Sequence, residues 1–396
     1  MMKKSVVVCY LSILSLFTMG IGFHAGIYSN FLRSAGLDEL QINLVNVFFF
    51  VTLFLFEIPT GIFADVYGRK KSFLISCSLL SVSMLVYSFS ETFWGFSFAE
   101  TIAAIGITFY SGAFQAWFVD SLKHHGYGGK LNKVFAWEST TRSLSCIASA
   151  IVGGYLADIS YSLSWLAGGI FYIITLVISA VVMKEEYFKH KHHSLGEALS
   201  VMKLTAIGSI RFTRRNKAFR FVVIIGTIQM FCFMAPNMQW QKIFIDKVNL
   251  NVYMGIVMAF IQIMVIIGSQ ISRKNIFNFS TNEKVGMAIS QLIIGIGITF
   301  TVIFQSFPIT IVFFLMHEVG RGMFGPIKSS YLQENIPSKK RATIGSFESM
   351  YTHIGGALGL VASGWIAKDI GIPAAWIMSG LILIVMSIFV FVKNKK

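Results

Sequence analysis

The sequence predicts an all-α membrane protein in which twelve transmembrane helices form two bundles of six. Three observations predict this class. Charged residues make up 13% of the 396 residues and hydrophobic residues make up 55%, which is too few charges for a water-facing surface. Apolar runs of about 20 residues, long enough to cross the hydrocarbon core of a bilayer as helices, recur along the chain. The two halves of the chain also resemble each other at a constant offset of 210 residues.

The apolar runs give the expected helices in chain order. Their ranges are 6–31, 41–66, 72–89, 93–120, 132–157, 161–183, 219–245, 252–272, 284–304, 308–333, 342–367 and 371–392. The polar segment 184–218 is a linker that separates an N-terminal bundle, 1–183, from a C-terminal bundle, 219–396. His190, His192 and His193 in this linker lie among lysines, which favours a solvated basic surface over a metal site.

Basic residues are distributed very unevenly over the loops. The loops and termini on one side of the membrane hold 26 of the 33 lysines and arginines. Because cationic loops stay in the cytoplasm, we expect both termini there. The net charge of +15 therefore reflects contact with the lipid bilayer, and no signature of a nucleic-acid-binding module is present.

The repeat is clearest where "FAWESTTRSLSCIASAIVGGYLAD" aligns with "IGSFESMYTHIGGALGLVASGWIAKD". This alignment pairs Glu138 with Glu348 and Gly154 with Gly364. Parallel repeats of six helices are typical of transporters whose substrate passes between the two bundles. No phosphate-binding G-x-x-x-x-G-K-[ST] loop is present, so we expect an ion gradient as the energy source and no cofactor or metal.

The stretch "EIPTGIFADVYGRKK", Glu57 to Lys71, contains the pattern G-x-x-x-D-x-x-G-R-K/R. The chain thereby resembles the major facilitator superfamily, and "EIPT" is similar to its bacterial multidrug-efflux branch. The resemblance implies a latch that holds the bundles in the outward-facing state, formed by Gly61, Asp65, Gly68, Arg69, Lys70 and Asp120. Glycine permits a close helix crossing and a sharp turn, and the arginine offers a bidentate fork to Asp120. The alternative is that the basic residues only fix the topology.

Two carboxylates lie inside apolar helices of the N-terminal half. Glu57 is about 12 Å deeper in its helix than Asp65, where a charge is expensive. It is a proton-coupling candidate, or it bonds backbone groups freed by Pro59. Glu100 is a second candidate, at a place where many members of the family carry an arginine. The same resemblance makes Asp120 a possible proton carrier.

The segment "HEVGRGMFGP" places His317, Glu318 and Arg321 within one turn near mid-membrane. Glu318 resembles a carboxylate of proton-coupled exporters and is our first candidate for proton or substrate binding. The alternative is a closed structural pair with Arg321. Glu138 and Arg142, four residues apart, form either a structural pair or part of the coupling path.

The helix 132–157 also contains "SCIASAIVGG", which is similar to an antiporter motif but lacks its proline and two of its glycines. Small residues of this kind also serve ordinary helix packing.

Further candidates for substrate binding lie near Pro236, which we expect to interrupt its helix. They are Asn237, Trp240 and Gln241, which line a substrate path or form the wet outer end of the helix. His24 faces a cavity or is satisfied by neighbouring groups.

Together with these patterns, the resemblance implies a monomeric, proton-coupled exporter of small amphipathic compounds from a bacterial cytoplasm, located in the bacterial inner membrane and without enzymatic activity. Alternatives are an exporter of an endogenous metallophore or siderophore, an uptake symporter, a lipid flippase and a membrane-embedded sensor.

Overall fold

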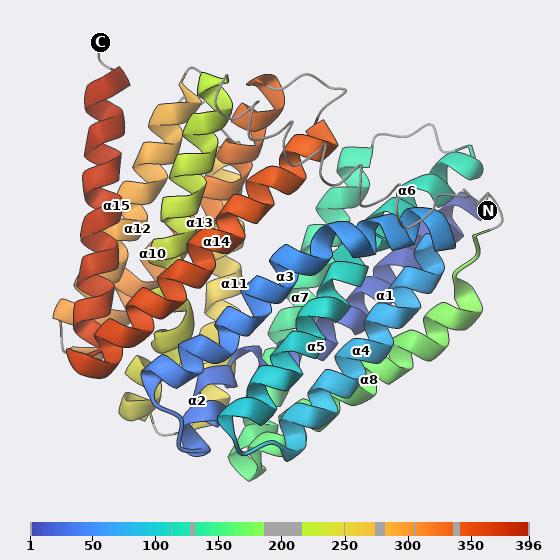
Figure 1. Cartoon of the computed structure of the whole chain (residues 1–396), viewed down its shortest axis with the longest axis horizontal. Coiled ribbons are helices and arrows are strands. Elements are labelled where there is room, and N and C mark those ends of the chain that lie inside the picture. The colour runs from blue at the N-terminus through green and yellow to red at the C-terminus, as the bar shows by residue number, and fades with distance from the viewer. Residues whose placement is uncertain are drawn as a thin grey trace. The chain divides into compact units, whose positions relative to one another are not determined.

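The computed structural model describes residues 2–111, 113–126, 131–185, 216–248, 250–273, 282–304, 306–335 and 341–394. These residues form helices joined by short turns, and no strand occurs among them (Figure 1). The described chain falls into two compact units. Unit 1 comprises Met1–Leu37, Phe48–Met202 and Phe244–Ala259, and unit 2 comprises Asp38–Val47, Lys203–Ile243 and Phe260–Lys396. The histidines of the predicted linker lie outside the described residues.

Unit 1 contains the helices of the N-terminal half of the chain. They are α1 (Met2–Ala25), α2 (Tyr28–Ser34), α3 (Glu39–Tyr67, from Phe48 onward), α4 (Arg69–Phe89), α5 (Phe93–Ser111), α6 (Phe114–His124), α7 (Leu131–Ile159) and α8 (Tyr161–Val182). Within this unit α1 packs against α7 and α8, and α4 packs against α5 and α8.

Unit 2 contains the helices of the C-terminal half. They are α10 (Lys217–Val248, up to Ile243), α11 (Asn251–Arg273, from Phe260 onward), α12 (Glu283–Ile303), α13 (Phe307–Asn335), α14 (Arg341–Asp369) and α15 (Ile372–Asn394), together with the start of α3 up to Val47. Helix α12 packs against both α13 and α15 (Figure 1). A buried apolar cluster that includes Val222, Met287, Phe324 and Val390 joins α10, α12, α13 and α15. This cluster places the start of α10 beside the end of α15.

Each predicted span coincides with one helix or with a pair of consecutive helices. Ten described helices or helix pairs are long and apolar enough to cross a membrane. Helices α7 and α14 are not among these ten, although each is 29 residues long. They carry polar side chains such as those of Glu138 and Glu348.

Two predicted spans are interrupted in the structure. The span 6–31 breaks between α1 and α2, where Gly26 lies, and the span 93–120 breaks between α5 and α6. Glycine is a poor helix former and a common site of helix breaks, which fits the position of Gly26 between α1 and α2. Pro236 lies inside the continuous helix α10, so the predicted interruption there is wrong.

The sequence repeat has a structural counterpart in how two helices pack. On α7, a Cβ added at Gly153 would lie 1.8 Å from the carbonyl oxygen of Phe23 in α1. On α14, a Cβ added at Gly359 would lie 2.3 Å from the carbonyl oxygen of Phe231 in α10. The backbones therefore touch in both units, because small residues remove the side chains that would separate the helices.

In the last turn of each of these two helices, a charged side chain contacts the start of another helix. Asp158 of α7 accepts hydrogen bonds from the backbone amides of Asn251 (2.6 Å) and Val252 (3.0 Å), which begin α11 and belong to unit 1. At the repeat-related position of α14, Lys368 Nζ lies 3.0 Å from Oδ2 of Asp38, within unit 2. The same end of each repeat therefore uses a charged side chain to fix a helix start, through a cap in one unit and an ion pair in the other.

Candidate functional site

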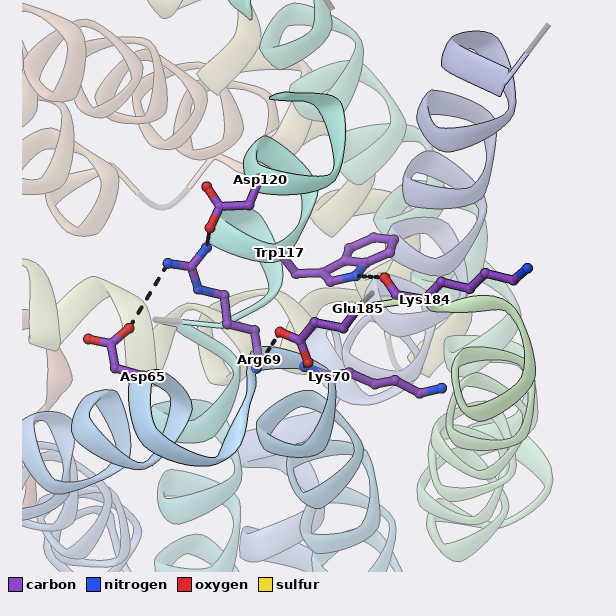
Figure 2. Close-up of polar contacts among 7 residues, drawn as sticks. All are labelled: Asp65, Arg69, Lys70, Trp117, Asp120, Lys184 and Glu185. Atoms are coloured by element: carbon purple, nitrogen blue, oxygen red, sulfur yellow. Dashed lines mark hydrogen bonds and ion pairs between the residues drawn. The ribbon is translucent and has the colours of Figure 1, made fainter. Parts of the chain in front are cut away.

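The motif at the α3–α4 turn forms a compact polar cluster in unit 1 (Figure 2). Gly68 has φ of 103°, a conformation that favours glycine, and it ends α3 immediately before α4 begins. This turn directs the Arg69 guanidinium towards α6, where it forms a short ion pair with Asp120. Asp65, one turn earlier on α3, lies 4.0 Å from the same guanidinium.

Glu185 is a member of this cluster that the sequence reasoning missed. Its carboxylate follows α8 and accepts hydrogen bonds from the backbone amides of Arg69 (2.8 Å) and Lys70 (3.2 Å), as Figure 2 shows. A carboxylate at this position neutralises orphan amides at the N-terminus of α4. The only sequence signal was an acidic pair, Glu185 and Glu186, directly after a predicted helix.

Two more hydrogen bonds tie the end of α8 to the motif. Lys70 Nζ donates to the carbonyl oxygen of Ala180 over 2.7 Å, and Trp117 Nε1 donates to that of Lys184 over 2.9 Å. These contacts join α3, α4, α6 and α8 within unit 1. The latch between the two bundles stays a prediction. An added Cβ at Gly61 meets no described atom within 4 Å, and its role in the latch stays a prediction.

Glu100 lies in an aromatic cluster in the interior of unit 1. Its residue surface is 7% exposed, and its Oε1 accepts a hydrogen bond of 2.8 Å from the hydroxyl of Tyr28. The hydroxyls of Tyr28 and Tyr87 are 3.2 Å apart. The Tyr87 ring stacks on Trp165 with 3.9 Å between centroids, and the His24 ring stacks on Trp165 at 4.3 Å.

The partners of Glu100 are neutral. The phenols of Tyr28 and Tyr87 are its hydrogen-bonding neighbours, and no lysine or arginine of the described chain forms an ion pair with it. A charged carboxylate in such surroundings lacks compensation, and burying an unpaired charge is costly. The neutral carboxylic acid suits this site better.

Glu318 in unit 2 has the opposite environment. Its side chain is 5% exposed, and its Oε2 accepts a 2.5 Å hydrogen bond from Nε of Arg321, one turn later on α13. Nε2 of His317 lies 3.3 Å from Oε1, and Nδ1 of His317 contacts the carbonyl oxygen of Phe314. The guanidinium of Arg321 also lies 5.0 Å from the ring centroid of Phe233. Glu318 is therefore compensated by a cation in the same turn.

Two further acid–base pairs contain the carboxylates that the repeat relates, Glu138 and Glu348. In unit 1, Arg142 Nη2 donates to Glu138 Oε1 (3.1 Å) and to the hydroxyl of Tyr110 (3.0 Å). In unit 2, Lys328 Nζ donates to Glu348 Oε1 over 2.7 Å. The sequence predicted the first pair from its i,i+4 spacing. It missed the second, because Lys328 and Glu348 lie on different helices and no local spacing connects them.

The remaining predicted site residues lie apart from these pairs. The side chain of Glu57 is half-buried in α3. In unit 2, Trp240 and Gln241 are buried near the end of α10 while Asn237 is half-buried, and Trp240 lies 6.0 Å from Phe314, centroid to centroid. Among the described residues, no group of three or more His, Cys, Asp or Glu side chains is arranged to hold a metal ion.

The chain matches the family description "Major Facilitator Superfamily" over residues 10–279 and 280–396. This chain belongs to the major facilitator superfamily. It is therefore a multi-pass membrane transporter of small molecules rather than an enzyme.

Relatives by sequence include an MFS-type transporter of Methanocaldococcus jannaschii, 22% identical over 100% of this chain and 99% of that protein. The quinolone resistance protein NorA of Staphylococcus aureus is 23% identical over 63% of this chain and 60% of its own. Multidrug resistance protein 2 of Bacillus subtilis is 20% identical over 49% and 47%, respectively.

Solved structures support the same fold. The crystal structure of a variant of the nucleoside transporter NupG superposes with a TM-score of 0.80 at 14% identity, covering 98% of this chain and 99% of that one. A POT family transporter in complex with 5-aminolevulinic acid superposes with a TM-score of 0.75 at 13% identity, over 98% and 96%. At these low sequence identities, the structural similarity shows only that the fold is shared.

Proposed function

We propose that this major facilitator superfamily member is a proton-coupled secondary transporter that exports small amphipathic compounds by alternating access. The single observation that carries proton coupling is the environment of Glu100, a carboxyl group buried in a membrane-spanning segment among neutral phenols. Export is supported by the similarity to the quinolone and multidrug resistance proteins. Uptake remains the alternative, since the structural neighbours include nucleoside and peptide transporters.

In the proposed cycle, Glu100 holds a proton while its aromatic surroundings stay dry. Release of that proton leaves a carboxylate that needs water or a cationic group to stabilise it. A substrate or a hydrated cavity that reaches Glu100 from one side of the membrane supplies this stabilisation. Protonation of Glu100 from the other side of the membrane restores the neutral acid. The substrate then loses its interaction with the carboxylate and is released. The Tyr28 hydroxyl, which donates to Glu100 Oε1, retains the carboxyl group in both states.

Glu100 and Glu318 have different neighbours, and this difference supports different roles for them. The sequence made Glu318 the first candidate for proton or substrate binding. Its contact with Arg321 supports a carboxylate that stays charged through the cycle, because a paired arginine offsets the cost of burial. Arg321 has a 29% exposed side chain, so it can meet an anionic part of a substrate. Glu318, His317 and Arg321 therefore fit substrate binding better than proton transfer.

The topology completes the proposal. The excess of basic residues on one set of loops supports cytoplasmic termini in a bacterial inner membrane. We propose a monomer driven by the proton gradient, with the cluster of Asp65, Arg69, Asp120 and Glu185 on the cytoplasmic side. Within unit 1 this cluster fixes α3, α4, α6 and α8 as one body, which suits a bundle that rocks as a rigid unit.

The test is transport in proteoliposomes with an imposed pH gradient. Fluoroquinolones, cationic dyes and metal chelators serve as probe substrates. We expect gradient-driven flux in the wild type and its loss in Glu100→Gln. Glu91→Gln, which changes an exposed carboxylate in the turn between α4 and α5, is the matched control and should transport normally. Flux that is equal with and without the gradient would refute proton coupling, and normal coupling in Glu100→Gln would remove that residue from it.

A further inference from the structure

An apolar groove lies on the surface of unit 2 between α10 and α15. It has a volume of about 540 Å³ and is lined by six apolar side chains: Ile228, Leu381, Ile382, Val385, Met386 and Phe389. Three of them are strongly exposed, with Val385 at 65%, Phe389 at 58% and Leu381 at 50%. Both helices are long and apolar enough to span a membrane, so the surroundings of the groove at this depth are hydrocarbon.

Basic side chains stand at one end of this groove. On α15, Leu381, Val385, Phe389 and Lys393 follow one another at four-residue intervals and so share one face of the helix. The Lys393 ammonium lies 5.6 Å from the ring centroid of Phe389, which places it directly beyond the last lining residue. The apolar face of α15 therefore ends in a cation.

The α10 side of the groove has the same arrangement. Arg220, Ile224 and Ile228 follow at four-residue intervals, and both Arg220 and Ile224 are exposed. Arg220 lies about 12 Å from Ile228 along the helix axis, towards the start of α10. Val222 and Val390 share one buried cluster, so the start of α10 and the end of α15 are adjacent. Arg220 and Lys393 thus stand on the two helices at the same end of the groove.

We propose that this groove binds an anionic phospholipid, with an acyl chain against the six apolar side chains and the phosphate near Arg220 and Lys393. The charge pattern selects this occupant. The positive-inside rule accounts for basic residues at cytoplasmic helix ends in general. An anionic lipid is the occupant whose acyl chain matches the apolar lining and whose phosphate matches these two cations. A helix of another protein or of a second copy would have to present an acidic residue next to an apolar stripe.

The site would stabilise the packing of α15 on unit 2. Its lipid would connect α10 and α15 where the groove separates their side chains. A transporter whose C-terminal unit carries such a lipid should depend on membrane charge, independently of the substrate and of proton coupling.

The experiment is native mass spectrometry of the full-length protein released from mixed phosphatidylglycerol and phosphatidylcholine. We expect retained phosphatidylglycerol on the wild type. The double variant Arg220→Gln/Lys393→Gln should retain it roughly 25-fold less, at on the order of fivefold for each basic side chain near an anionic headgroup. Arg273→Gln, which removes an exposed arginine from the end of α11 outside the groove, is the control for loss of a basic side chain elsewhere and should retain the lipid.

A second variant tests the apolar half of the site. Val385→Trp fills the groove while leaving both cations in place, so it should release the lipid with the protein still folded by size-exclusion chromatography. Unchanged retention in both the double variant and Val385→Trp would overturn the proposal. A lipid-free dimer that Val385→Trp dissociates would overturn it as well, since the occupant would then be a second copy.

Discussion

Arg321 donates a hydrogen bond from Nε to Oε2 of Glu318 over 2.5 Å, one turn apart on α13 in the interior of unit 2. Glu318 is almost fully buried, so its charge depends on this guanidinium and on His317, whose Nε2 lies 3.3 Å away. Glu100 in unit 1 is equally buried but has only phenols beside it. Substitution of a neighbour or of the carboxyl group itself should therefore affect Glu318 and Glu100 differently.

A double-mutant cycle on the Glu318–Arg321 pair is the first prediction. Arg321→Gln strands a buried carboxylate and should lower the free energy of unfolding by about 2 to 4 kcal/mol. Adding Glu318→Gln removes the stranded charge and should restore part of the loss. Denaturation in detergent micelles measures both. If the double variant is as unstable as the sum of the single variants, the two residues are not coupled.

Glycine substitutions test the backbone contact between α7 and α1. Gly153→Ala would put a Cβ 1.8 Å from the carbonyl oxygen of Phe23, so the helices must separate. We expect a loss of about 3 kcal/mol or failure to fold, as for overpacking of a tight core. Gly61→Ala is the matched control, because its Cβ meets open space. Similar thermal stability of the two variants would contradict the observed packing.

The cap on α4 gives a prediction for Glu185. Replacing it by Gln removes the negative charge from the amides of Arg69 and Lys70 and should cost about 1 kcal/mol, the usual value of a helix N-terminal cap. Thermal unfolding compared with Glu91→Gln checks this. A stability indistinguishable from that control would mean that the cap contributes nothing measurable.

The contact between Asp38 and Lys368 predicts a pH dependence. Partial burial alone would raise the pKa of Asp38. The backbone amide of Gln41 and the ammonium of Lys368 lower this pKa by more than burial raises it, so the net pKa is depressed. A depressed carboxyl pKa contributes stability above the unfolded value of about 3.9, and this is lost as the pH falls through the folded value. Melting temperatures of wild type and Asp38→Asn should differ at neutral pH and converge once the pH has fallen below the depressed folded pKa. A constant difference across the range would contradict the contact.

Much of the fold follows from the sequence, because apolar length and the positions of polar breaks alone determine where helices cross a membrane. The interruptions between α1 and α2 and between α5 and α6 were missed, since the apolar runs there are compatible with continuous helices. The opposite error occurred at Pro236, where neighbouring packing tolerates the missing amide and α10 continues.

From residue spacing, the candidate site is predictable only where partners are close in sequence; the distant pairing of Arg69 with Asp120 was an implication of the family resemblance. The spacing of Glu318 and Arg321, and of Glu138 and Arg142, is visible in one helix turn. The contacts of Glu348 with Lys328, of Glu185 with the start of α4, and of Glu100 with Tyr28 join separate helices. Such contacts depend on how the helices pack, which periodicity does not specify. The ranking of Glu318 above Glu100 from the sequence therefore could not take into account which side chains surround each of them.

The most direct measurement is infrared difference spectroscopy of the carboxylic acid C=O band in reconstituted protein at neutral pH, with and without a transported substrate. The account predicts a band from a protonated buried carboxyl group that responds to substrate, disappears in Glu100→Gln and persists in Glu318→Gln. A band that persists in Glu100→Gln and disappears in Glu318→Gln would contradict it, because the buried proton would then reside on the carboxyl group that Arg321 neutralises.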